Sequence, residues 1–159
     1  MAHVVIDLND QRPVWAQPEW FAQEVRAALP EDWTLAVMRT PSEGTGDGAT
    51  RVHPDVLAAV RDARVYMGFG IPEELLKAAP ALEWVHTGSA GVGSSLTPEM
   101  LRRDLVFTNS AGIHGPPMAE AVLGMILHFS RGFDFAGHIT HTPLGDENGI
   151  SVSNVHIVG

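Results

Sequence analysis

The sequence contains no cysteine and has few basic residues. Without cysteine the chain can form no disulfide, no thiolate metal site and no cysteine nucleophile. Lysine and arginine total 10, against 19 aspartates and glutamates, so the formal net charge is −9. A nucleic-acid groove or a patch for anionic membranes needs clustered positive charge, which this balance argues against. We therefore expect neither nucleic acid nor a membrane as a partner.

Long hydrophobic runs are also missing. No apolar stretch approaches the roughly 20 residues that a membrane-spanning helix needs. The N-terminal stretch MAHVVIDLND lacks the basic segment and long apolar core of a signal peptide. A cytoplasmic location is the resulting expectation. The chain has 159 residues, of which 45% are hydrophobic, so it is close to one average domain and can bury a core.

Short apolar strands alternate with amphipathic helices along the chain. The expected strands are residues 3–8, 34–39, 64–69, 82–86, 105–108 and 152–158. The expected helices are residues 18–29, 54–63, 72–79, 98–103 and 116–131. This alternation predicts an α/β fold, with a parallel sheet that carries helices on both faces. Residues 40–50 hold three glycines and no large apolar residue, which predicts a flexible loop.

The helix expected at 116–131 is the longest. Its apolar positions cover most of its circumference, so we expect it to be buried on several sides. Glu120 is expected in its first turn, where a carboxylate stabilises the helix dipole. The following residues, 132–150, are rich in glycine, histidine and polar side chains and are typical of a connection. His128, among apolar neighbours, is expected to be a packed or capping residue.

Three segments follow strands at the edge where open α/β sheets bind ligands, namely residues 68–72, 87–94 and 108–114. The second, TGSAGVGS, is the most informative. Its small residues could let backbone N–H groups hold an anion such as a carboxylate. Alternatively, Gly88, Gly91 and Gly93 could serve a tight turn that needs positive φ. The spacing matches neither a Walker loop nor G-x-G-x-x-G.

Polar residues near these segments suggest further candidates. Asn109, at a strand end, could bond a ligand carbonyl or carboxylate, or form an Asx turn. His86 ends a strand beside the glycine loop and is the best candidate for a titrating group near a site, followed by His114. His138 and His141 lie three apart, but without a supporting helix a solvated loop is the favoured interpretation, and no metal site is expected. No serine has the context of a nucleophile elbow.

Three stretches of the chain form a specific set. They are LEWVHTGSAGVG at 82–93, LVFTNSAGIH at 105–114 and PMAEAVLGMIL at 117–127. Together they resemble the NAD-dependent D-isomer-specific 2-hydroxyacid dehydrogenases. This family has a flavodoxin-like substrate domain, into which a Rossmann NAD domain is inserted. The resemblance implies a flavodoxin-like substrate-binding domain over residues 1–115. It also implies an interdomain helix and the first strand of a truncated NAD-binding domain over residues 116–159.

The resemblance also implies roles for individual residues. Backbone N–H groups near Ala90 and Gly91 would hold the substrate carboxylate. Their loop also includes Ser89 and Val92 as substrate-binding residues. Asn109 would hydrogen-bond the substrate. The substrate entry would be lined by Phe69 and Gly70.

On the cofactor side, Met118 would approach the nicotinamide and Gly159 would be the first glycine of the dinucleotide signature. Glu120 would help to fix the interdomain hinge. The reaction would be hydride transfer between NAD or NADP and a small 2-keto or 2-hydroxy acid. The full-length parent is expected to be a homodimer that binds NAD or NADP. The present chain alone is not expected to bind this cofactor.

The chain departs from the family pattern in places. Gly93 stands where the family often has an aspartate, and residues 134–150 match the usual connection poorly. The family's catalytic arginine, glutamate and histidine would lie beyond Gly159. We therefore expect no catalytic residue in this chain and no activity from it alone. Two alternatives remain: a stand-alone flavodoxin-like module that binds small carboxylates, and a protein that dimerises through its long apolar helix.

Overall fold

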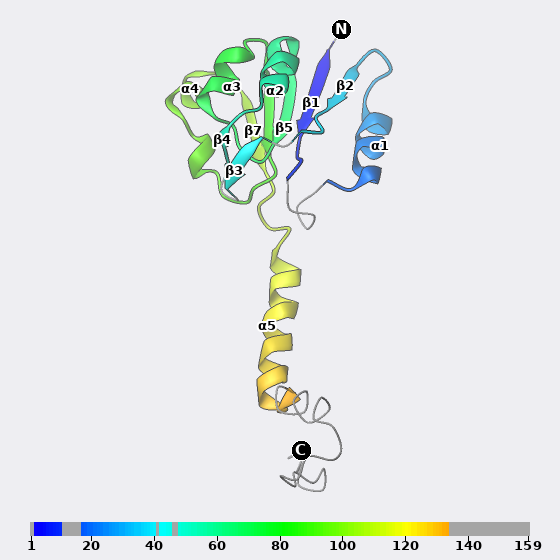
Figure 1. Ribbon diagram of the computed structural model, residues 1–159, viewed down its shortest axis with the longest axis vertical. Helices are drawn as coiled ribbons and strands as arrows, with labels where there is room; N and C mark the ends of the chain where they lie inside the picture. Colours follow the sequence, from blue (N-terminus) through cyan, green and yellow to red (C-terminus); the bar gives the residue numbers. More distant parts are fainter. Residues whose placement is uncertain (1, 11–16, 41, 46–47, 134–159) are drawn as a thin grey trace, which may run out of the picture. The chain divides into compact units, whose positions relative to one another are not determined.

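The computed structural model describes residues 2–10, 17–40, 42–45 and 48–133 (Figure 1). Contacts divide the chain into two units, Met1–Gly112 and Ile113–Gly159. The expected strand at 152–158 lies outside the described residues. The domain assignments 1–115 and 116–159 stay predictions.

A five-stranded parallel sheet organises the first unit (Figure 1). Its strands are β1 (His3–Asp7), β2 (Thr34–Val37), β5 (Val65–Gly68), β6 (Trp84–Thr87) and β7 (Val106–Asn109). They lie in the order β2-β1-β5-β6-β7, and all four neighbouring pairs are parallel. Counted along this sheet alone, the order is 2-1-3-4-5, which is the flavodoxin-like arrangement. The α/β fold with a parallel sheet and helices on both faces is confirmed.

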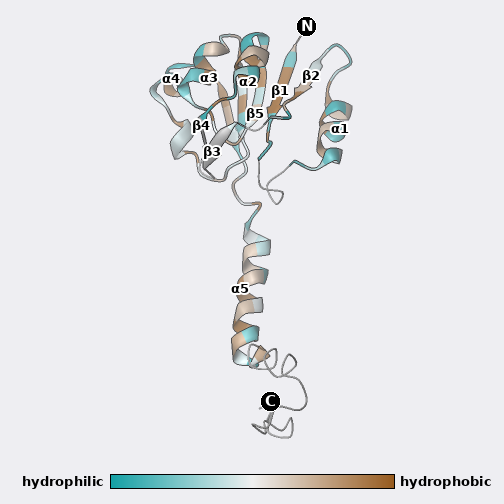
Figure 2. Cartoon of the chain, in the orientation of Figure 1, coloured by the Kyte–Doolittle hydropathy of each residue, from teal (hydrophilic) through white to brown (hydrophobic). Residues whose placement is uncertain are grey.

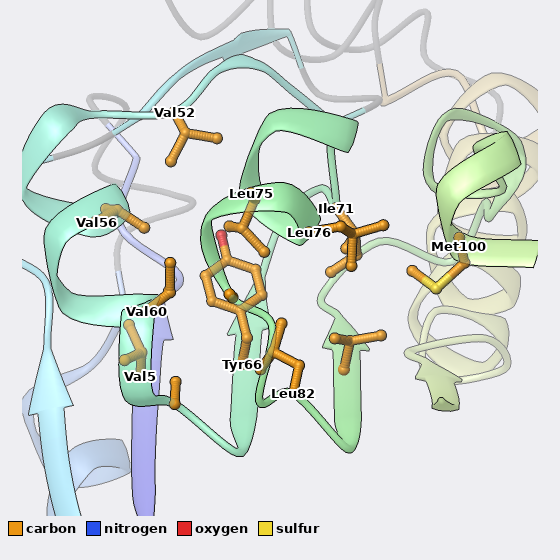
Figure 3. Close-up of a cluster of buried hydrophobic side chains, with 13 residues drawn as sticks. Val5, Val52, Val56, Val60, Tyr66, Ile71, Leu75, Leu76, Leu82 and Met100 are labelled. Carbon is orange, nitrogen blue, oxygen red and sulfur yellow. The ribbon is translucent and has the colours of Figure 1, made fainter. Parts of the chain in front are cut away.

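One face of the sheet packs against three short helices. These are α2 (Pro54–Ala59), α3 (Glu73–Ala78) and α4 (Pro98–Arg102), with 3₁₀ turns at Val60–Asp62 and Gly93–Ser95. Figure 3 shows their apolar side chains around the fully buried Tyr66. Helix α4 begins at a proline, which suits a first turn, and the Thr97 hydroxyl accepts a bond from the Met100 N–H at 3.2 Å. The proline and the Thr97 cap together stabilise the start of this five-residue helix.

Helix α1 (Glu19–Ala28) packs on part of the opposite face. Its residues Phe21 and Val25 pack on a second cluster, whose buried members are Val4, Ile6 and Val65. These three come from β1 and β5, so α1 lies over that side of the sheet. The two clusters place the strands between two helical layers, as the near-continuous apolar strands require.

Residues 40–50 do not form only a loop. Within them, β3 (Glu43–Thr45) pairs antiparallel with β4 (Gly48–Arg51). The expectation of a flexible loop is therefore wrong for these residues. Glycine-rich composition favours a loop, but the Asp-Gly dipeptide at 47–48 is also a strong signal for a β-hairpin.

Helix α5 (Gly115–Ser130) is the long helix expected from the sequence. Two expectations about it are wrong. None of its residues is buried, although its apolar residues recur along much of its length (Figure 2). Glu120 does not lie in the first turn, because the helix begins at Gly115 and the first turn contains no acid. His128 is exposed and contacts the rings of Phe129 and Phe133. No helix among the described residues is long and apolar enough to cross a bilayer.

Candidate functional site

The carboxyl ends of four strands lie in one row. Register pairs Asp7 of β1 with Gly68 of β5, Gly68 with Thr87 of β6, and Thr87 with Asn109 of β7. The segments singled out from the sequence all follow this row. The strand order reverses direction between β1 and β5, and ligands of open α/β sheets bind at such a switch point.

Hydrogen bonds tie the three segments to one another. The Phe69 carbonyl accepts from the Ser89 hydroxyl at 2.9 Å and from the Thr87 hydroxyl at 3.3 Å. The Ser110 N–H donates to the Ser89 carbonyl at 3.3 Å. Phe69 and Ser89 are half-buried, Gly70 is buried, and Ala90 and Gly91 are exposed. The structure thus brings together the residues expected to bind substrate in the first unit.

Asn109 has a definite contact within this edge. Its side-chain nitrogen donates to the Ala90 carbonyl at 2.8 Å. Neither interpretation from the sequence included this contact, because it joins two loops that are distant along the chain. Asn109 therefore braces the glycine loop in one position, which is useful to a site built from backbone N–H groups.

The glycines of the loop are not explained by backbone strain. Among the described residues only Gly112 and Gly132 have positive φ, so the positive-φ interpretation of Gly88, Gly91 and Gly93 is wrong. Gly88 is closely packed, since a Cβ there would lie 2.8 Å from Leu8 Cδ2 and 3.2 Å from the Phe69 ring, so these side chains would have to shift. A Cβ on Gly91 or Gly93 would meet nothing within 4 Å. The fold itself therefore gives no reason for glycine at these two positions.

The backbone of the loop is available to a ligand. In the part of the chain that the structure describes, no backbone hydrogen bond occupies the N–H of Ala90 or Gly91. Both residues are exposed. Backbone N–H groups beside small residues are donors that can hold an anion without any cationic side chain.

His86 belongs to a hydrogen-bond network beside the loop. Its Nδ1 lies 2.9 Å from the Thr108 hydroxyl, and its Nε2 lies 3.2 Å from the Ser110 hydroxyl. The Trp84 indole N–H also donates to Thr108 Oγ1 at 2.9 Å. Burial lowers the pKa of His86 from its ordinary value, so the imidazole is neutral at pH 7. A neutral ring held at both nitrogens orders the strand ends rather than titrating near pH 7.

Sequence reasoning missed Asp7 at the switch point. Its side chain is 4% exposed, and its Oδ2 accepts from the Ser42 hydroxyl at 2.7 Å and from the Tyr66 hydroxyl at 3.1 Å. Its Oδ1 is buried and has no hydrogen-bond partner among the described residues. Burial raises the pKa of Asp7, while the bonds from Ser42 and Tyr66 and the nearby His53 oppose the rise. In the sequence, the one feature that points to Asp7 is its position as an acidic residue at the end of an apolar strand.

We predict that Asp7→Asn gains stability relative to the wild type as pH rises from about 4 to 7. Because the folded pKa of Asp7 is raised above its ordinary value of 3.8, folded Asp7 holds its proton more tightly than unfolded Asp7. Its favourable contribution is complete below the unfolded pKa and is lost as pH rises through the folded pKa. Urea unfolding at several pH values measures the difference.

Ser42→Ala is the matched variant for this experiment. It removes one hydrogen bond that lowers the pKa of Asp7, so the wild-type loss of stability with rising pH should become steeper. If the difference between Asp7→Asn and wild type were the same at every pH, the folded pKa of Asp7 would not be raised.

The remaining predicted residues lie elsewhere or outside the described chain. Met118 is an exposed residue of α5. Gly159, His138 and His141 lie outside the described residues. Within the described ranges no group of three or more histidines, aspartates or glutamates could hold a metal ion. Comparison with known protein families gives no match to this chain, and comparison with curated proteins gives no significant match.

Proposed function

We propose that the carboxyl edge of the sheet binds the carboxylate of a small 2-keto or 2-hydroxy acid. On this proposal the chain is the substrate domain of an NAD(P)-dependent 2-hydroxyacid dehydrogenase. The observation that supports it most is Gly91, an exposed glycine that neither φ nor packing requires. On folding, glycine loses more conformational entropy than alanine, at a cost of about 0.5–1 kcal/mol. Binding can offset this cost where a ligand must approach the backbone closely.

Each group at this edge has a part in such binding. The carboxylate accepts from the N–H groups of Ala90 and Gly91. Asn109 holds the loop through the Ala90 carbonyl, so that these donors keep their direction. Phe69 presents an apolar surface beside them for the side chain of the acid. The described residues contain no dinucleotide signature, so the proposal gives this chain substrate binding and orientation, while NAD(P)H supplies the hydride.

Gly91→Val tests the role of the loop. A Cβ at this position meets nothing within 4 Å, so the bulk of valine is added at the loop surface, next to the N–H groups that the proposal assigns to the carboxylate. We predict that binding of glyoxylate, hydroxypyruvate or phenylpyruvate weakens at least about tenfold, which is the loss of roughly one charge-assisted hydrogen bond. Because valine restricts the unfolded chain more than glycine does, the free energy of unfolding should stay the same or rise by up to about 1 kcal/mol. Calorimetric titration and urea unfolding measure the two quantities.

Two controls sharpen the result. Gly88→Val should be less stable than Gly91→Val, because a Cβ at Gly88 would lie 2.8 Å from Leu8 Cδ2 and 3.2 Å from the Phe69 ring, so both side chains must shift. The neutral amide of each acid should bind more weakly than the acid, because it lacks the anionic oxygen. The proposal fails if Gly91→Val binds these acids as wild type does, or if the amides bind equally well.

A further inference from the structure

Two successive carbonyl groups of the glycine loop are held by the same neighbouring segment. The Ser89 carbonyl accepts from the Ser110 N–H at 3.3 Å. The Ala90 carbonyl accepts from the Asn109 side-chain nitrogen at 2.8 Å. These two donors are consecutive residues, one at the end of β7 and one directly after it. The loop is therefore bound at two adjacent peptide groups.

The same two peptide groups carry the N–H donors that the proposed function assigns to a carboxylate. The Ser89 carbonyl shares its peptide group with the Ala90 N–H, and the Ala90 carbonyl shares its group with the Gly91 N–H. Both groups are trans and planar, so each N–H points opposite to its carbonyl. A bond that holds a carbonyl against residues 109 and 110 therefore aims the attached N–H away from them. It also polarises the peptide group, which makes the N–H a stronger donor.

Ser110 is in turn held by the imidazole of His86. The Nε2 atom of His86 lies 3.2 Å from Ser110 Oγ, and its Nδ1 lies 2.9 Å from Thr108 Oγ1. Thr108 Oγ1 also accepts from the Trp84 indole at 2.9 Å. At the other end, the Ser110 hydroxyl lies 3.5 Å from the Thr87 carbonyl, to which it can donate. These contacts form one continuous series from Trp84 to the strand end of β6.

One tautomer of His86 uses every hydrogen in this series. The Trp84 indole can only donate, so the Thr108 hydroxyl accepts from it and gives its own hydrogen to Nδ1. Nε2 then carries the ring hydrogen and donates to Ser110 Oγ. In the other tautomer Thr108 Oγ1 would accept from two N–H groups, and its hydrogen would have no acceptor among the described residues. Burial lowers the pKa of His86, which keeps the ring neutral and Nδ1 free to accept.

We propose that His86, in its Nε2–H tautomer, and Ser110 are positioning residues of the carboxylate site. His86 fixes Ser110, the Ser110 N–H fixes the Ser89 carbonyl, and the peptide group that contains this carbonyl aims the Ala90 N–H at the bound acid. Neither side chain has to touch the acid. This role rests on the proposed function for its ligand, whereas the orientation of the peptide group is a property of the free chain.

Two amide variants of His86 separate positioning from a general effect on stability. The amide of glutamine lies about where histidine has Nε2, and the amide of asparagine about where it has Nδ1. His86→Gln can therefore keep the contact with Ser110, which His86→Asn loses. We expect His86→Asn to weaken binding of glyoxylate, hydroxypyruvate or phenylpyruvate about threefold to tenfold, and His86→Gln to stay within about twofold of wild type. Calorimetric titration measures both affinities.

Backbone NMR of the free chain tests the positioning without any ligand, and the same spectra show that each variant is folded. The resonances of the peptide group that joins Ser89 to Ala90 should shift in His86→Asn and in Ser110→Ala. The double variant should shift them no further, because both changes break the same series of contacts. In the wild type, the nitrogen resonances of the His86 ring should show the hydrogen on Nε2.

Asn109→Ala serves as the reciprocal control, because Asn109 holds the next peptide group. It should shift the Gly91 N–H resonance more than that of Ala90. A wild-type chain that binds none of the acids overturns the proposed function and the role in binding with it, while the NMR shifts still decide whether His86 orients the loop. The positioning is overturned if the ring hydrogen lies on Nδ1, or if His86→Asn leaves the Ala90 N–H unshifted. Equal losses of affinity in His86→Asn and His86→Gln also overturn it, and leave the proposed function standing.

Discussion

Tyr66→Ala is expected to lower the free energy of unfolding by about 3–5 kcal/mol. Tyr66 is fully buried at the centre of the larger core cluster, where Leu75 and Leu76 of α3 surround its ring (Figure 3). Its ring also lies against Gly68, since a Cβ there would come within 2.7 Å of the ring and 2.3 Å of the hydroxyl. Truncation leaves a cavity between sheet and helices and removes one donor to Asp7. Urea unfolding measures the loss.

Tyr66→Phe separates the two parts of this effect. The ring stays and only the hydroxyl bond to Asp7 Oδ2 is removed, so the expected loss is about 1–3 kcal/mol. Burial and the charge of Asp7 hold the pKa of Tyr66 well above its usual range, so the hydroxyl remains a donor at neutral pH. A loss below about 1 kcal/mol for Tyr66→Ala would contradict the central place of this ring.

The sequence predicts the strands and helices of this fold well, because each leaves a local signal. An apolar β-branched run marks β1, short hydrophobic segments mark β5 and β6, and prolines mark the starts of α2 and α4. The hairpin β3–β4 gives a weaker signal, since short strands of glycine and threonine resemble a loop in composition. The surroundings of α5 could not be predicted. Its apolar positions predict burial, but burial depends on what lies against the helix, which the pattern does not specify.

For the candidate site, the sequence likewise predicts one part and not another. Its place follows from topology, since the ends of neighbouring parallel strands must lie at one edge. Its contacts do not, because they join residues far apart in the chain: Asp7 bonds Ser42 and Tyr66, which are 35 and 59 positions away. The φ of Gly91 is likewise set by the fold. Glycine in the sequence allows both positive φ and a close approach of a ligand, and the structure excludes positive φ at Gly91.

Arg103→Ala is expected to lower the free energy of unfolding by about 2–3 kcal/mol. The sequence gives this residue no special mark. In the fold its Nη1 donates to the Leu76 carbonyl at 2.8 Å, and its Nη2 lies 3.1, 3.0 and 3.4 Å from the carbonyls of Ala79, Pro80 and Leu82. These carbonyls end α3 and lead to β6, so one cation satisfies acceptors that the helix end leaves open.

Arg103→Lys shows whether geometry or charge carries this stabilisation. Lysine keeps the cation at the α3 C-terminus, where the helix dipole favours it by about 0.3–1 kcal/mol. However, a single ammonium cannot reproduce the fork of the guanidinium across several carbonyls. The free energy of unfolding of Arg103→Lys should therefore lie between those of Arg103→Ala and wild type, nearer to Arg103→Ala. Arg102→Ala is the matched control, because Arg102 is exposed and its hydrogen bonds go to Pro98 and Glu99 of its own helix. Equal losses in Arg103→Ala and Arg102→Ala would show that the carbonyl contacts of Arg103 add nothing, because an exposed pair contributes only about 0–1 kcal/mol.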